Sequence, residues 1–71
     1  MKLWTIYDHP KDHPEHFVVR AWTVINGEMF AELVHERFDS LNAARNVMRA
    51  AGRKLLGREP DDDPCIVETW A

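Results

Sequence analysis

A chain of 71 residues is expected to form one small domain, and a domain of this size buries only about 60% of the surface that its unfolded form exposes. Its composition of 45% apolar and 30% charged residues, with a formal net charge of −3, is typical of a soluble globular protein and excludes an intrinsically disordered one. The negative charge also argues against nucleic-acid binding, which needs clustered lysine and arginine.

Cysteine content and the N-terminal pattern bear on the compartment. Cys65 has no second cysteine with which to form an internal disulfide, and one thiol cannot supply a cysteine-type zinc site. The first apolar run ends at Asp8, which is too short for a secretory signal or a membrane span. We therefore expect a cytoplasmic protein without a membrane role. The three glycines are isolated, so no phosphate loop or other cofactor-binding motif is predicted.

The first half of the chain has the pattern of strands. Residues 3–7 are aromatic and branched, which predicts a short strand, and the prolines of residues 8–16 predict an irregular loop. Residues 17–25 carry the strongest strand pattern.

A hairpin is predicted next. Asn26-Gly27 suits the left-handed positions of a tight turn, and residues 29–38 alternate as a returning strand. Because glutamate, methionine, alanine and leucine also favour helices, a helix over residues 29–37 remains an alternative.

A helix is predicted from Ser40 onward, where Asp39 or Ser40 can cap its first amides and Gly57 can end it. Its apolar stripe consists of Leu41, Ala44, Met48, Ala51 and Leu55. The basic residues Arg45, Arg49 and Arg53 lie away from this stripe and are expected to face solvent.

The end of the chain completes the predicted fold. Residues 57–64 predict a polar loop, and residues 65–70 predict a final strand. The whole chain, residues 1–71, is therefore expected to be a single α+β domain. Its order β-β-β-α-β predicts a mainly antiparallel sheet of about four strands with one helix packed on one face.

Alternation along the second predicted strand separates two faces of the sheet. The face of residues 17, 19, 21, 23 and 25 carries no charge and is expected to lie beneath the helix. One helix can cover only one side, so the helix-free face is the candidate interaction surface. Its predicted binding residues, drawn from the second, third and last strands, are Arg20, Trp22, Glu32, Glu36, Glu68 and Trp70.

Tryptophan and arginine on an open face are typical of protein interfaces. This pattern predicts a non-enzymatic protein-binding or self-associating module, with a protein partner or a second copy in a homodimer. The alternative is that arginine–glutamate pairs simply cover the tryptophans, without a binding role.

Three histidines in the first loop offer a second hypothesis. His9, His13 and His16 are interleaved with carboxylates, and these ligand types suit a divalent transition metal. The prolines rule out a helical arrangement, so an irregular loop would have to bring the imidazoles together, and a solvated loop is the other interpretation. Ser40 is explained as a helix cap and Cys65 as a buried thiol, so we predict no enzymatic activity.

Three segments carry a family resemblance. They are residues 4–10 (Trp-Thr-Ile-Tyr-Asp-His-Pro), residues 16–22 (His-Phe-Val-Val-Arg-Ala-Trp) and residues 63–70 (Asp-Pro-Cys-Ile-Val-Glu-Thr-Trp). With them, the chain resembles a family of small uncharacterised bacterial proteins with no assigned activity. The resemblance implies a cytoplasmic, stand-alone domain and no catalytic residue.

Overall fold

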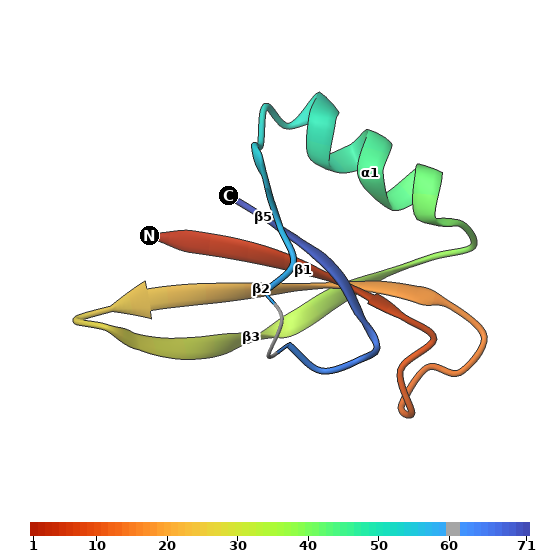
Figure 1. The fold of residues 1–71 in the computed structure, drawn as a ribbon, viewed down its shortest axis with the longest axis horizontal. Coiled ribbons are helices and arrows are strands. Elements are labelled where there is room, and N and C mark those ends of the chain that lie inside the picture. Colours follow the sequence, from red (N-terminus) through yellow and green to blue (C-terminus); the bar gives the residue numbers. More distant parts are fainter. Residues whose placement is uncertain (60–61) are drawn as a thin grey trace.

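The computed structural model describes residues 1–59 and 62–71, and for residues 33–35 it describes the backbone alone. Its elements are β1 (Lys2–Asp8), β2 (Phe17–Ile25), β3 (Glu28–Phe38), α1 (Leu41–Ala50), β4 (Leu55–Gly57) and β5 (Ile66–Trp70). The strands form one antiparallel sheet in the order β3-β2-β1-β5-β4, with α1 over one side (Figure 1). The α+β class is confirmed, and the predicted number of about four strands was too low.

The β2–β3 hairpin forms at the predicted turn. Asn26 and Gly27 have φ values of 51° and 81°, so both central residues occupy the left-handed region that a type I′ turn requires. Ile25 therefore lies opposite Glu28. β3 is a strand throughout, which confirms the strand prediction for residues 29–38 and shows that the helical alternative was wrong.

The helix is shorter than its apolar stripe predicted. It begins where the Ser40 hydroxyl accepts a hydrogen bond from the Ala43 amide at 3.1 Å. It ends because Gly52 adopts a φ of 74°. The amides of Gly52 and the following residue then donate to the carbonyls of Arg49 and Met48, at 3.0 and 3.1 Å, in a Schellman motif.

The early helix end leaves room for β4. The prediction that Leu55 belongs to the helix was wrong, because the chain turns back at Gly52 and Leu55 begins a strand beside β5. Lys54 and Ala71 exchange two backbone hydrogen bonds, at 2.7 and 2.8 Å, next to this pair of strands.

Within residues 1–59 and 62–71, the structure contains no helix with the length and apolar character that a membrane span requires.

The core lies between α1 and the face of the sheet beneath it. Its buried members come from β1, β2, α1 and β5 and are Ile6, Val19, Ala44, Met48 and Trp70. The side chains packed around them are Trp4, Phe17, Phe38, Leu41 and Val67. The uncharged face of β2 therefore lies beneath the helix, as predicted.

Truncating a core side chain should destabilise the domain far more than the same change at the surface. Ile6 is fully buried and Ile25 is 55% exposed. We expect Ile6→Ala to lower the free energy of unfolding by about 2–5 kcal/mol, a large part of the roughly 4–10 kcal/mol available to a domain this small. Ile25→Ala should cost under about 1 kcal/mol. Urea denaturation followed by tryptophan fluorescence measures both, and equal losses would contradict this core.

Candidate functional site

The pairing of β5 places two of the six predicted binding residues beneath the helix. Glu68 lies opposite Ile6, which belongs to the core. Trp70 is itself part of that core, with only 3% of its surface exposed. Their prediction as residues of the helix-free face was therefore wrong, because β5 pairs with β1 in a register that turns both side chains toward α1.

Two glutamates of β3 also lie on the helix side. Glu36 is opposite Val19 of the core, and Glu32 lines a small cavity beside the helix. The prediction that Glu32 and Glu36 lie on the helix-free face was therefore wrong as well. The two-residue turn pairs Ile25 with Glu28, and the register shifts between Trp22 and Arg20. On both sides of this shift, even-numbered residues of β3 lie opposite odd-numbered residues of β2.

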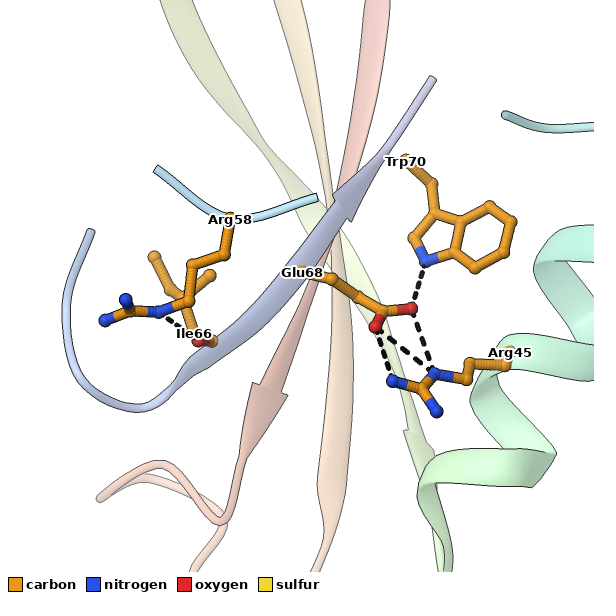
Figure 2. A network of polar contacts seen from close by, with 5 residues as sticks. All are labelled: Arg45, Arg58, Ile66, Glu68 and Trp70. Carbon is orange, nitrogen blue, oxygen red and sulfur yellow. Dashed lines mark hydrogen bonds and ion pairs between the residues drawn. The ribbon is translucent and has the colours of Figure 1, made fainter. Parts of the chain in front are cut away.

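Glu68 joins the helix to the sheet (Figure 2). Its buried carboxylate accepts hydrogen bonds from Nη2 of Arg45 at 2.7 Å, from Nε of Arg45 at 3.1 and 3.2 Å, and from Nε1 of Trp70 at 2.7 Å. Burial raises the pKa of Glu68, but the donors on Arg45 and Trp70 outweigh burial and bring the pKa below its usual value. Arg45 thus reaches the sheet, contrary to its expected solvent-facing position.

The three histidines do not converge. His9 and His13 each lie beside the aspartate that precedes them, and Nε2 of His16 is 3.7 Å from Oδ1 of Asp39. Within residues 1–59 and 62–71, no group of three or more histidine, cysteine, aspartate or glutamate side chains is arranged to hold a metal ion. The geometry therefore gives the metal hypothesis no support.

Arg20 and Trp22 lie on the helix-free face, opposite Thr5 and Leu3 of β1. Nη2 of Arg20 donates to Oδ2 of Asp12 at 3.0 Å. This bond connects β2 to the histidine loop, residues 9–16, which joins β1 to β2. In Figure 1 this loop and residues 62–65 lie on the side of the sheet away from α1. The helix-free face is therefore partly covered by the chain's own loops.

The helix-free face is hollowed into a groove of about 450 Å³. All five strands and the loop after β4 contribute to its lining, which consists of Leu3, Thr5, Tyr7, Trp22, Met29, Leu56, Gly57, Glu59, Asp62, Ile66 and Thr69. Met29 and Leu56, from the two outermost strands, are 52% and 59% exposed. The groove was not predicted from the sequence because β4 was not predicted. The available signal was Gly52, since a glycine can adopt the positive φ that ends a helix and would leave the next residues free to form a strand.

The hydroxyl groups of Thr5, Tyr7 and Thr69 belong to residues that line the groove, whereas Cys65 precedes the lining residue Ile66. The hydroxyls of Thr5 and Thr69 lie 3.5 Å apart. Burial raises the pKa of Tyr7, which Arg20 only partly opposes. Burial also raises the pKa of the Cys65 thiol, with a further contribution from neighbouring Asp63. At neutral pH these groups supply hydrogen-bond donors rather than an anionic nucleophile.

Removing the Glu68 charge should destabilise the fold in a pH-dependent way. Glu68→Gln should lower the free energy of unfolding by about 1–3 kcal/mol near neutral pH. Because the folded-state pKa of Glu68 is depressed, the carboxylate stabilises the fold fully above its unfolded pKa of about 4.3. This stabilisation disappears as pH falls through the folded-state pKa. Urea denaturation from about pH 6 to about pH 3 should show the variant and wild type converging.

Glu36→Gln is the matched control, because Glu36 is exposed on the same side of the sheet. It should leave stability nearly unchanged across the same pH range. If the free energy of unfolding of Glu68→Gln remained below that of the wild type by the same amount at low pH, the ionised network would be contradicted.

Comparison with protein-family models, with curated proteins and with solved structures finds no match to this chain. A function must therefore be inferred from the chemistry of its own surface.

Proposed function

We propose that this chain is a non-enzymatic protein-binding module and that the groove on the helix-free face holds an apolar segment of a partner protein. The observation that carries the proposal is the groove itself, which has a volume of about 450 Å³ and is lined by residues of all five strands. Ligand pockets generally occupy about 300–1,000 Å³ and combine apolar walls with a few polar groups. Trp22, Met29 and Leu56 supply such walls, and Tyr7 and the threonines supply the polar groups.

The exposure of the groove walls favours a chain segment as the occupant. Met29 and Leu56 each leave more than half of their surface in water, although burial of a leucine side chain is worth about 1.5–3 kcal/mol. A partner side chain seated between them would recover part of that free energy. Methionine adapts to the shape of a partner, and tryptophan is enriched where partners bind most tightly.

The chemistry of the remaining side chains favours binding over catalysis. The Ser40 hydroxyl is engaged as the helix cap, and burial keeps the Cys65 thiol neutral. The Glu68 carboxylate is enclosed by donors from Arg45 and Trp70. Each of these groups has a structural role that accounts for its position.

Two neighbouring leucines provide a sharp test of the groove. Leu56 lines it, whereas Leu55 lies opposite Trp70 on the helix side, and their exposures of 59% and 54% are nearly equal. Peptides selected from a random displayed library against the wild-type chain should bind Leu56→Glu at least about tenfold more weakly, because a leucine contact is replaced by a desolvated charge. Leu55→Glu should bind them as the wild type does. Fluorescence anisotropy of labelled peptides measures both affinities.

Two outcomes would contradict a groove that binds another protein. The first is a set of selected peptides that binds both variants equally, or no selected peptide at all. The second is a wild-type homodimer, detected by analytical ultracentrifugation, that Leu56→Glu dissociates and Leu55→Glu does not. That result would assign the groove to a second copy of this chain.

A further inference from the structure

On the basis of the proposed function, we infer that the groove recognises a partner segment in which a lysine or arginine lies next to the apolar residue that enters it. Two carboxylates, those of Glu59 and Asp62, line the same groove as Trp22 and Leu56. The groove therefore combines an apolar wall with an anionic rim. A segment that is both apolar and cationic matches both parts.

The rim carboxylates form no ion pair within the described structure. Among residues 1–59 and 62–71, no lysine, arginine or histidine forms an ion pair with Glu59 or Asp62. Arg58, the nearest cation in sequence, instead donates to backbone carbonyls, including Nε to the Ile66 oxygen at 3.0 Å (Figure 2). Its Nη2 donates to the carbonyl oxygen of Asp62 at 3.1 Å. Arg58 thus anchors this loop to β5 and leaves the carboxylates to an outside cation.

The rim is held in place before a partner arrives. Oδ2 of Asp62 accepts a hydrogen bond from the Glu59 amide at 3.0 Å, and the Asp62 amide donates to the Glu59 carbonyl at 3.1 Å. These two bonds hold the residues together at the groove edge, which reduces the ordering cost of binding. At the other end of the helix-free face, the guanidinium of Arg20 is paired with Asp12.

The aromatic wall supports the same kind of ligand. A cation close to the face of a tryptophan ring is attracted by the ring quadrupole, and Trp22 belongs to the groove lining. Described residues of the chain already make this interaction, with Arg20 over Tyr7 at 5.6 Å and Arg53 over Trp4 at 3.4 Å. A long basic side chain can therefore lie along the apolar wall while its charge reaches the rim.

Three capped peptides test the charge preference on the full chain. They are N-acetylated, C-amidated tetrapeptides of sequence Trp-Leu-X-Gly, with lysine, glutamine or glutamate at X. Titrations followed by amide NMR shifts should show the lysine peptide binding roughly two- to tenfold more tightly than the glutamine peptide, and the glutamate peptide most weakly. The preference should shrink toward about 1 M salt, where exposed charges are screened.

The double variant Glu59→Gln/Asp62→Asn should bind all three peptides alike. Glu28→Gln/Glu36→Gln changes the net charge equally but lies on the helix side of β3, so it should retain the preference. Equal affinities for the three peptides in the wild type, with binding still lost in Leu56→Glu, would overturn the basic partner and leave the groove intact. Failure of every peptide to shift the groove resonances would overturn the protein-binding groove as well.

Discussion

One helix of ten residues can cover only one face of a five-stranded sheet, and the arrangement of the other side chains follows from that limit. The helix covers the face that carries Ile6 and Trp70, where apolar burial stabilises the domain most. The opposite face must be covered by loops, by solvent or by a partner. Contact between Asp12 and Arg20 covers one end of it, and the groove lies in the part that remains.

Carboxylates on the two sides of the sheet illustrate two different uses of the same group. Glu68 is buried and receives donors from Arg45 and Trp70 of its own chain, so it fixes the helix on the sheet. Glu59 and Asp62 stand at the edge of the groove, where the nearest arginine binds carbonyls instead. Removing one partner of a buried charge pair destabilises a fold because the other charge is left buried and uncompensated, whereas charges at the rim of a groove can attract a cation of a partner.

Much of the fold could be predicted from local sequence, but the predicted binding residues of β3 and β5 were assigned to the wrong face of the sheet. The bounds of β2, the turn at Asn26-Gly27 and the cap at Ser40 depend on neighbouring residues and were predicted. The side of Glu36 also depends on the register shift between Trp22 and Arg20 in the β2–β3 pairing, which the two-residue turn does not dictate. β4 was missed because Leu55 continues the helical spacing, while Gly52 ends the helix before it.

The sequence by itself determined the α+β class, the hairpin and the helix start, because these depend on interactions between residues close along the chain. Tertiary structure alone decided that Trp70 is buried, that the histidine side chains lie against different aspartates and that a groove opens on the helix-free face. Strand alternation separates the residues of β5 into two sets but does not show which set faces the helix. That choice depends on how β1 pairs with β5, where Thr5 meets Thr69 across 64 residues of sequence.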